Sequence, residues 1–567
     1  MDTFKIVTTL LGGLAIFIFG MNLMSDGLQK AAGDKMKRIL SMLTANPVLG
    51  VLAGALTTAV LQSSSATTVM IIGFVSAGLM KLPQAISVVL GANIGTTITA
   101  QLIAFKIGDY AWIFVFIGFI LYFFMKKKEF VMDIGQIMFG FGILFVGINT
   151  MSSTMVPLAS SPVFTDMILK VQDIPVLGVM VGTLMTVIIQ SSSATIAVLQ
   201  NLAATAGPDG IHSVIGLEGA LPILFGDNIG TTITALLASI GASINAKRTA
   251  IAHTIFNITG TLIFIWFIPQ IADLMRMISP QGAEIDVISR QIANAHTSFN
   301  LSCTILFLPI IGLLVKVVTK LIPGNDAERL DSEPIYLDEK VVNQPVFAIH
   351  LAIQELTRNA KFAFDMVIKS KQAFLSSDKK AMDSVMETEV TLNSIRSKIV
   401  NYLSLILSTE NTTEAQGEKV SALMHVASDI EHIGDYCKNI VRLSKEKDDN
   451  KYEFSDVAYS EIYNCFDHIT QMIETTIVAL DKGDVDKALE VFKYEEEINQ
   501  LERNLRKSHM QRVNEKVCSP AFTVVYTDII HNIERIGDSC KNIAEVVLKG
   551  AKQKGLIDNI DKYVEKK

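Results

Sequence analysis

The sequence predicts an all-α protein in which a polytopic membrane part precedes a soluble helical bundle. The apolar residues concentrate between Ile6 and Ile322, whereas the chain from about Asp326 to Lys567 is charged and amphipathic. The 567 residues are 50% hydrophobic, which is too apolar for a single soluble globule. Each part also contains an internal repeat, so we expect two domains, each built from two related halves.

The first part contains seven apolar runs that reach or approach the ~20 residues needed to span a bilayer. They are Ile6–Ser25, Leu82–Phe105, Tyr110–Met125 (short), Ile134–Met155, Gly219–Ala246, Thr249–Ala272 and Gln291–Val315. The first run is preceded only by Lys5 and has no Ala-x-Ala cleavage pattern. We therefore expect it to be a mature membrane helix and not a signal peptide.

Four further apolar runs are too short to cross a membrane. Val48–Leu61 and Ala66–Met80 flank Gln62-Ser63-Ser64-Ser65, and Val176–Ile189 and Ala194–Ala206 flank Gln190-Ser191-Ser192-Ser193. Two half-length helices joined by a polar break indicate a re-entrant hairpin that turns back inside the protein.

The hairpins belong to a longer repeat with three matched segments in the same order. Val48–Thr68 matches Val176–Ile196 at an offset of 128 residues, Gly91–Ala100 matches Gly226–Ala235 at 135, and Gly20–Asn22 matches Gly147–Asn149 at 127. With the N-terminus outside and no net crossing by either hairpin, the inside loops carry twelve Lys and Arg residues and the outside loops five. The runs that contain Gly20–Asn22 and Gly147–Asn149 are the lead-in helices of the two repeats. Counted from the first lead-in helix, three crossings precede the second, an odd number, so the repeats are expected to be inverted, as in many secondary transporters.

Both Gln-Ser-Ser-Ser segments offer small, uncharged oxygen ligands at a helix break. The hydroxyls and the glutamine carbonyl suit Na⁺, and the free amides at the start of the second half-helix suit an anion. The repeated Gly-x-Asn-Ile-Gly-Thr-Thr segment is expected to interrupt a helix at its two glycines and to add further oxygens. Asp227, opposite Ala92, is the one acidic residue in these motifs. A carboxylate inside the membrane is costly unless a cation or a proton accompanies it, and a coupling Na⁺ is the expected cation.

These motifs give two overlapping sets of candidate ligands. The candidates for an anion are Gln62, Ser63, Ser64, Ser65, Asn93, Gln190, Ser191, Ser192, Ser193 and Asn228. The candidates for Na⁺ are Gln62, Ser65, Thr67, Thr96, Thr97, Gln190, Ser193, Thr195, Asp227, Thr231 and Thr232.

Less specific explanations exist for each of these residues. A serine run often caps a helix, a threonine in a membrane helix often bonds to its own turn, and Asp227 could cap a half-helix. His253 and His296 lie in a second short repeat at an offset of 43 residues, inside apolar runs. Such polar residues are often functional, and the alternative is that they form hydrogen bonds between helices.

The doubled motifs Gln62–Thr67 and Gln190–Thr195, with Gly91–Thr97 and Gly226–Thr232, resemble the type II sodium–phosphate cotransporter family over residues 6–320. The resemblance implies Na⁺-coupled uptake of inorganic phosphate, with substrate and Na⁺ held by the two hairpins. Asp227 departs from the family pattern, which usually has a small uncharged residue there.

The second part predicts long amphipathic helices in two halves of three helices each. Glu431–Ile440 and Glu534–Ile543 agree at eight of ten positions at an offset of 103 residues. On a helix, Glu431 and Asp435 share one face, as do Glu534 and Asp538, and such pairs suit Mg²⁺, Mn²⁺ or Fe³⁺. The alternative is a solvated face bridged by Lys438 or Lys541. Residues 340–552 resemble the PhoU domain, a regulator of phosphate uptake. The resemblance implies that these paired motif acids bind a divalent or ferric metal. Glu387–Glu389 and Glu495–Glu497, on the preceding helices, are weaker ligand candidates.

The predicted organisation is a membrane domain over residues 1–322, with repeats at about 6–125 and 131–246 and helices at 249–320. A linker at 323–337, a PhoU-like domain at 338–556 and a tail at 557–567 complete it. The net charge of −7 argues against nucleic acid, five scattered cysteines suit a reducing cytosol, and no catalytic or nucleotide-binding motif appears, so we expect no enzyme.

We therefore expect a multi-pass protein of a prokaryotic plasma membrane, with the N-terminus outside and the PhoU-like domain in the cytoplasm. The expected partners are phosphate, Na⁺ and the lipid bilayer, and the sequence is compatible with a homo-oligomer. An exporter or a carrier of another oxyanion, and a phosphate-sensing scaffold that does not transport, are the alternatives.

Overall fold

A computed structural model describes residues 3–32, 46–76, 78–105, 107–125, 128–159, 168, 170–171, 173–324, 333–409, 412–520 and 523–553. The chain divides into two compact units, Met1–Ala327 and Glu328–Lys567. The predicted tail at 557–567 and part of the predicted linker lie outside the described residues.

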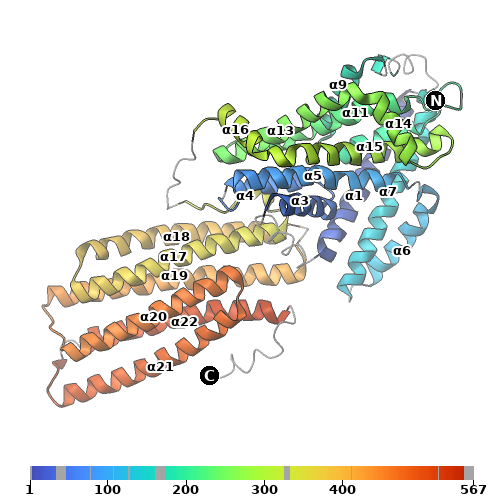
Figure 1. The fold of residues 1–567 in the computed structure, drawn as a ribbon. Coiled ribbons are helices and arrows are strands. Elements are labelled where there is room, and N and C mark those ends of the chain that lie inside the picture. The colour runs from blue at the N-terminus through green and yellow to red at the C-terminus, as the bar shows by residue number, and fades with distance from the viewer. Residues whose placement is uncertain are drawn as a thin grey trace. The chain divides into compact units, whose positions relative to one another are not determined.

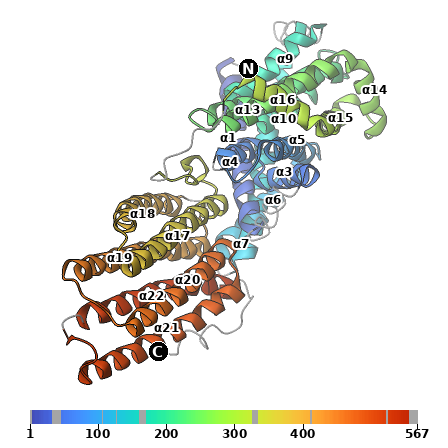
Figure 2. The ribbon, with the colours of Figure 1, turned by 60° about the vertical axis from the view of Figure 1, so that its left-hand side comes forward.

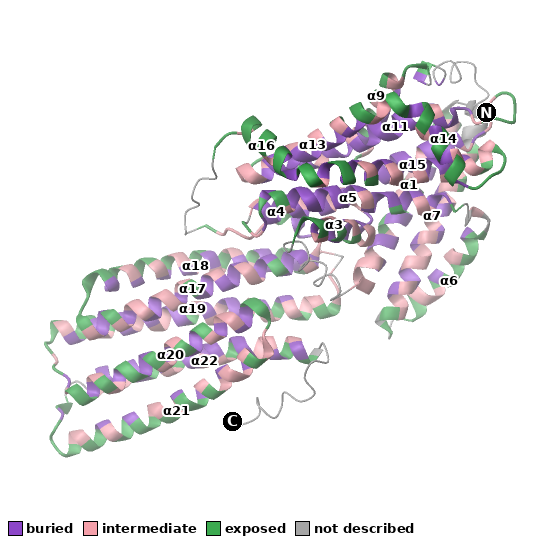
Figure 3. Cartoon of the chain, in the orientation of Figure 1, coloured by how far each residue is buried: buried purple, intermediate pink, exposed green. Residues whose placement is uncertain are grey.

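Among the described residues of the first unit, six helical segments are long and apolar enough to cross a membrane: Phe4–Ala32, Leu82–Ile103, Phe130–Ser153, Gly216–Ala238, Ile244–Ile278 and Glu284–Leu321. The predicted run Tyr110–Met125 forms only α6 (Ala111–Phe124), which is shorter than these six. Figure 3 shows that α5 is largely buried, whereas α6 is largely exposed.

Repeat-equivalent helices α1 (Thr3–Ala32) and α7 (Glu129–Ala159) pack against each other in opposite directions. A Cβ built at Gly20 would lie 2.4 Å from the amide of Leu144 and 2.7 Å from the carbonyl oxygen of Gly140. A Cβ at Gly147 would lie 2.7 Å from the carbonyl oxygen of Gly13. Because higher residue numbers on one helix meet lower numbers on the other, the two repeats are inverted, as the sequence predicts.

Within each repeat, the first hairpin helix packs very closely on the helix that carries the Gly-x-Asn-Ile-Gly-Thr-Thr motif. These pairs are α3 (Pro47–Leu61) with α5 (Leu82–Ile103), and α9 (Pro175–Ile189) with α11 (Gly216–Gly230). A Cβ at Gly91 would lie 1.9 Å from the carbonyl oxygen of Val51, and one at Gly226 would lie 2.0 Å from that of Val179. The motif glycines therefore let two helix backbones touch.

This packing corrects the predicted helix interruption at the motif. In the first repeat α5 continues without a break through Gly91 and Gly95. In the second repeat only Thr231 separates α11 from α12 (Thr232–Ala238), and Thr231 itself keeps right-handed helical dihedral angles. The glycines are explained by close packing, which sequence periodicity does not reveal.

The polar breaks of the two hairpins are present. Gln62 and Gln190 end α3 and α9 in the left-handed conformation, with φ of 49° and 56°. The second hairpin helices α4 (Ser64–Ser76) and α10 (Ser192–Ala203) then begin after one further residue. The breaks thus fall inside both Gln-Ser-Ser-Ser segments.

The rest of this unit consists of two long segments, each divided by a 3-10 turn followed by a further helix. The first contains α13 (Ile244–Phe264), η2 (Ile265–Phe267) and α14 (Ile268–Ile278), and the second contains α15 (Glu284–Phe307), η3 (Leu308–Ile310) and α16 (Ile311–Leu321). Figure 1 shows α5, α13 and α15 side by side, and a Cβ at Gly260 of α13 would lie 2.7 Å from Cys303 Sγ of α15.

The second unit has the predicted two halves of three long helices (Figure 2). They are α17 (Pro345–Ser376), α18 (Lys379–Leu407) and α19 (Glu414–Asp449), then α20 (Asp456–Lys482), α21 (Val485–Asn514) and α22 (Thr523–Gln553). Side-chain caps start several of them: Asp378, Thr413, Ser455 and Asp484 each accept a hydrogen bond from a backbone amide of the first turn.

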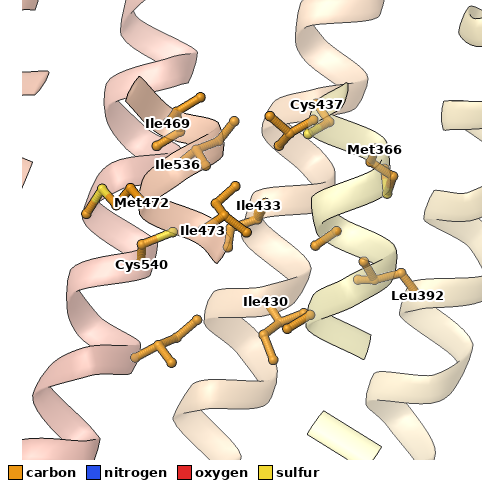
Figure 4. Packing of buried hydrophobic residues seen from close by; sticks show 14 of the residues in the cluster. Met366, Leu392, Ile430, Ile433, Cys437, Ile469, Met472, Ile473, Ile536 and Cys540 are labelled. Atoms are coloured by element: carbon orange, nitrogen blue, oxygen red, sulfur yellow. The ribbon is translucent and has the colours of Figure 1, made fainter. Parts of the chain in front are cut away.

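The helices that carry the repeated acidic motif form the centre of this unit. Figure 4 shows Ile433 and Cys437 of α19 in the same buried layer as Ile536 and Cys540 of α22. Asn542 donates to Asp429 Oδ1 at 3.0 Å, and the repeat-equivalent Asn439 donates to Asn532 Oδ1 at 3.5 Å. The two halves are thus joined by matching contacts around one core.

The packing of α5 on α3 predicts a specific sensitivity to side-chain size at Gly91. We expect Gly91→Ala to lower the free energy of unfolding by about 1–3 kcal/mol, because the new methyl group meets backbone atoms that cannot rotate away. The measurement is the thermal unfolding temperature of the detergent-purified protein. Gly312→Ala is the matched control, since a Cβ there meets nothing within 4 Å in the helix α16; equal effects of both changes would contradict this account.

Candidate functional site

The first serine of each hairpin motif caps a helix. Ser63 Oγ accepts a hydrogen bond from the amide of Ala66 at 3.1 Å, and Ser191 Oγ accepts one from the amide of Ala194 at 3.3 Å. The alternative of capping describes these two contacts, and the roles of Ser63 and Ser191 as anion ligands remain predictions. Ser64, Ser192 and Ser193 are buried at the starts of α4 and α10, where helix amides point toward the break.

Each hairpin contains a pair of threonine hydroxyls that joins its two helices. Thr58 donates to Thr67 at 2.9 Å, and the repeat-equivalent oxygens of Thr186 and Thr195 lie 3.1 Å apart. All four side chains are almost fully buried. Thr67 and Thr195 are among the candidates predicted from the sequence, whereas Thr58 and Thr186 are not. The repeat offset of 128 residues, at which Thr58 matches Thr186, is the signal that could have identified them.

In the second repeat this hydroxyl pair extends to a carboxylate. Thr186 donates to Asp227 Oδ1 at 2.6 Å, and Asp227 is fully buried. Its other oxygen, Oδ2, has no hydrogen-bond partner among the described residues. Ala92 occupies the equivalent position in the first repeat, so only the second repeat offers a negatively charged set of oxygens.

The two hairpins differ in how their glutamines and nearby serines are held. Gln62 is buried and its Oε1 accepts from Thr99 at 2.8 Å, whereas Gln190 is exposed. Ser65 accepts from Thr234 of the second repeat at 3.2 Å, so polar side chains of both repeats meet at the first hairpin.

The motif asparagines also have different partners. Asn93 donates to Asn257 Oδ1 at 2.8 Å, and its own Oδ1 lies 3.0 Å from His253 Nε2. Asn228 instead donates to the carbonyl oxygen of Leu224 in its own helix. His253 thus joins helices, as the less specific explanation supposed.

The four threonines that follow the motif asparagines hydrogen-bond within their own helices. The acceptors are the carbonyl oxygens of Ala92, Ile94, Asp227 and Ile229, and the donors in the same order are Thr96, Thr97, Thr231 and Thr232. The alternative of back-bonding describes these contacts, and their roles as Na⁺ ligands remain predictions.

In the second unit, the motif lysines do not bridge the motif acids. Lys438 Nζ instead lies 2.7 Å from Glu389 on α18, and Lys541 Nζ lies 2.9 Å from Glu495 on α21. The alternative in which these lysines bridge the motif acids is therefore not found, because each lysine reaches an acid on the preceding helix. Among the described residues, no three His, Cys, Asp or Glu side chains are arranged to hold a metal ion.

The two acidic pairs have different surroundings. Burial and the nearby carboxylate of Asp538 raise the pKa of Glu534 to about 7, and burial also raises the pKa of Asp538. Glu495 and Glu502 add to the negative charge near Glu534. The first half has Arg396 at the position of Glu502, when both are counted seven residues after the equivalent Glu389 and Glu495. Glu534 Oε2 is buried without a hydrogen bond in the described part of the chain. Basic side chains are also near: His531 Nδ1 lies 3.4 Å from Glu534 Oε2, and Arg535 lies 3.3 Å from Asp538 Oδ2. The carboxylates nevertheless outnumber the cations beside Glu534.

Inverted repeats, six segments long and apolar enough to cross a membrane and two polar hairpin breaks define a multi-pass membrane protein with inverted-repeat architecture. The Na⁺/Pi-cotransporter family model matches residues 16–153 and 151–280, and the PhoU domain model matches residues 356–444 and 462–547. The chain belongs to the Na⁺/Pi-cotransporter family and carries a PhoU domain.

Three relatives illustrate the range of this family. YqeW of Bacillus subtilis, named as uncharacterized, is 33% identical over 310 residues, which are 55% of this chain and 96% of that protein. The "Putative inorganic phosphate export protein YjbB" of Salmonella typhimurium is 22% identical over 95% of this chain and 97% of its own length. The "Sodium-dependent phosphate transport protein 2A" of Rattus norvegicus is 37% identical over 102 residues, or 17% of this chain and 16% of that protein.

Proposed function

We propose that this protein is a sodium-coupled symporter that carries inorganic phosphate across the plasma membrane of a prokaryote. The hairpins are proposed to be re-entrant, with the N-terminus outside and the PhoU domain in the cytoplasm. The observation that carries this proposal is the contact between Ser65 of the first hairpin and Thr234 of the second repeat, which brings hydroxyls of both repeats together at the start of α4. The family and the name of the rat relative support phosphate and sodium.

Net uptake follows from symport when the Na⁺ gradient points inward. Export is the second candidate, favoured by the name of YjbB, which matches this chain along nearly its whole length. The two differ in the sign of phosphate movement under one imposed gradient.

Flux in proteoliposomes tests the proposal directly. We expect a Na⁺ gradient to drive labelled phosphate in the same direction as Na⁺, and we expect Ser64→Ala with Ser65→Ala, or Ser192→Ala with Ser193→Ala, to reduce that flux at least about tenfold, since each double change removes two hydroxyls from a desolvated site. Ser153→Ala is a control, because Ser153 is exposed and bonds only to its own helix. Phosphate flux that is unaffected by the Na⁺ gradient, or that persists in both double variants, would contradict the proposal.

Asp227 is proposed to bind one coupling Na⁺ together with Thr186 and Thr195. Its free Oδ2 and the two hydroxyls provide hard oxygen ligands, and a cation would compensate the buried carboxylate. The alternative, a helix-capping role, requires hydrogen bonds to helix amides, whereas the bond found for this side chain is to Thr186.

The charge at Asp227 gives the second functional prediction. We expect Asp227→Ala and Asp227→Asn both to raise the Na⁺ concentration for half-maximal flux and to change the charge moved per phosphate, because a ligand and its negative charge are lost. Flux against Na⁺ concentration and currents in the same liposomes measure the two effects. Ala92→Ser serves as a control at the equivalent position of the first repeat; unchanged Na⁺ dependence in both Asp227 variants would remove this role.

We also propose that the acidic motifs of the PhoU domain bind a divalent or ferric metal, with Glu534 and Asp538 as the main ligands and Glu431 and Asp435 as their counterparts. The support is an excess of carboxylates: burial and the charges of Asp538, Glu502 and Glu495 raise the pKa of Glu534, whereas Arg535 lowers it, so positive charge is in deficit. A bound metal would supply that charge and hold α21 and α22 together.

This proposal predicts a pH-dependent stability. The folded pKa of Glu534, about 7, is above its ordinary value of 4.5, so the folded state binds the proton more tightly and stability falls as pH rises from about 4.5 to 7. We expect Mn²⁺ to abolish this fall, and Glu534→Gln to abolish both the fall and the response to Mn²⁺. Asp538→Asn should shift the fall to lower pH, since Asp538 helps to raise the pKa.

The measurement is thermal unfolding of the fragment from Glu328 onward, which contains a complete core of its own. A pH dependence that persists unchanged in Glu534→Gln would disprove the titration, and a lack of response to both Mn²⁺ and Fe³⁺ at pH 7.5 would disprove the metal site.

A further inference from the structure

The two repeats of the membrane unit share most of their internal contacts. A Cβ at Gly54 would lie 2.1 Å from the carbonyl oxygen of Val88, and one at the equivalent Gly182 would lie 2.0 Å from that of Ile223. The two hydroxyl pairs within the hairpins also match. Each hairpin therefore packs in the same way on its motif helix. We call α3, α4 and α5 the first hairpin body, and α9, α10 and α11 the second.

The contacts between these bodies and the paired helices α13 and α15 match at one point as well. Thr304 donates to the carbonyl oxygen of Leu90, and the equivalent Thr261 donates to that of Phe225, both at 3.4 Å. This establishes α13 and α15 as counterparts. The places where equivalent residues differ are consequently informative.

The first difference lies where the hairpins meet the lead-in helices. Ser25 of α1 donates to the carbonyl oxygen of Leu61, directly before the first hairpin break, at 2.6 Å. The equivalent Ser152 of α7 instead accepts from Asn201 of α10 at 3.1 Å. The lead-in helix α1 is thus bonded to the end of α3 at the first break, whereas the lead-in helix α7 is bonded to α10, the second helix of its hairpin.

The second difference lies at the glutamines. Thr99 holds Gln62 in the buried state, whereas its counterpart Thr234 donates to Ser65 and Gln190 is exposed. The first break is therefore covered and the second is open to solvent or lipid.

The third difference lies at the histidines. Asn93, His253 and Asn257 form a connected network between α5 and α13. Their counterparts Asn228, His296 and Asn300 lie on α11 and α15, but both ring nitrogens of His296 and Oδ1 of Asn300 have no partner in the described residues. His296 is 1% exposed and Asn300 is 0% exposed.

Polar groups buried without partners are costly, and their presence requires an explanation. The sequence gives the second set the same side chains as the connected first set. In an inverted repeat, alternating access consists of moving one body against the other around a central site, so contacts made by one repeat are available to its counterpart.

We propose that His296 and Asn300 form a latch that closes on Asn228 in the opposite-facing state, as His253 and Asn257 close on Asn93 in this one. In the opposite state, the hydroxyl of Thr234 donates to Gln190 instead of Ser65, and the hydroxyl of Thr99 donates to Ser193 instead of Gln62. Ser152 then donates to the carbonyl oxygen of Ile189. The two latches are mutually exclusive, and the hairpin bodies keep their internal contacts. This inference rests on the proposed transport function.

Cysteine labelling at the two breaks tests the proposal without measuring flux. Gln62→Cys and Gln190→Cys are introduced separately into the detergent-purified full chain, whose five native cysteines are all buried and free. We expect a maleimide to label Gln190→Cys faster than Gln62→Cys. Adding His253→Ala with Asn257→Ala should raise the labelling rate of Gln62→Cys about tenfold and lower that of Gln190→Cys, because the loss of the closed network shifts the population.

The opposite latch supplies the matched control. His296→Ala with Asn300→Ala should slow labelling of Gln62→Cys further or leave it at its low level, and should not reduce labelling of Gln190→Cys. Since these side chains have unpaired atoms in this state, the second pair is expected to fold normally; Asn300→Ala alone covers the case in which a double variant does not fold.

Reciprocal changes at the two reporters support the proposal even in a chain that carries no phosphate, so failure of transport and failure of the latch are distinguishable. Changes of the same sign at both reporters, or equal effects of the two latch variants, would overturn it.

Discussion

The contact between the backbones of α3 and α5, and of α9 and α11, is the constraint on which the membrane unit depends. At Gly91 and Gly226 the space for a side chain is occupied by a carbonyl oxygen of the neighbouring helix. This close approach fixes the hairpin breaks relative to the motif asparagines. Because this packing is the same in both repeats, the differences between the repeats lie in the polar side chains around the breaks.

The sequence was sufficient to predict the two units, the inverted repeats, the positions of the hairpin breaks and the three-helix halves of the PhoU domain. These features follow from apolar length, repeat offsets and helix periodicity. It was insufficient for the motif glycines, because a glycine that permits a bend and one that permits a close contact look identical in a sequence. It also could not predict the different surroundings of the two glutamines, since Gln62 and Gln190 are the same residue with opposite exposure.

Equivalent sequence with unequal contacts recurs in the PhoU domain, but for a different reason. There the lysine pairs match in both halves, and the difference comes from composition: Arg396 in one half and Glu502 in the other. The charge difference is permanent, whereas the difference at His253 and His296 lies between identical side chains. Only the second kind of asymmetry can be reversed by movement, which is why the proposed latch is assigned to the membrane unit.

Asp227, although Ala92 replaces it in the first repeat, is held by contacts that both repeats share. Its partner Thr186 is in the hydroxyl pair that both hairpins share, and its helix is held against α9 through Gly182. A cation at this carboxylate would therefore travel with the second hairpin body through both states, and would not be exchanged between bodies. Because Ala92 is neutral, movement of the two bodies across the membrane would carry charge asymmetrically. On this account, coupling to the membrane potential resides in one repeat, while the latch residues on α13 and α15 determine which repeat is open.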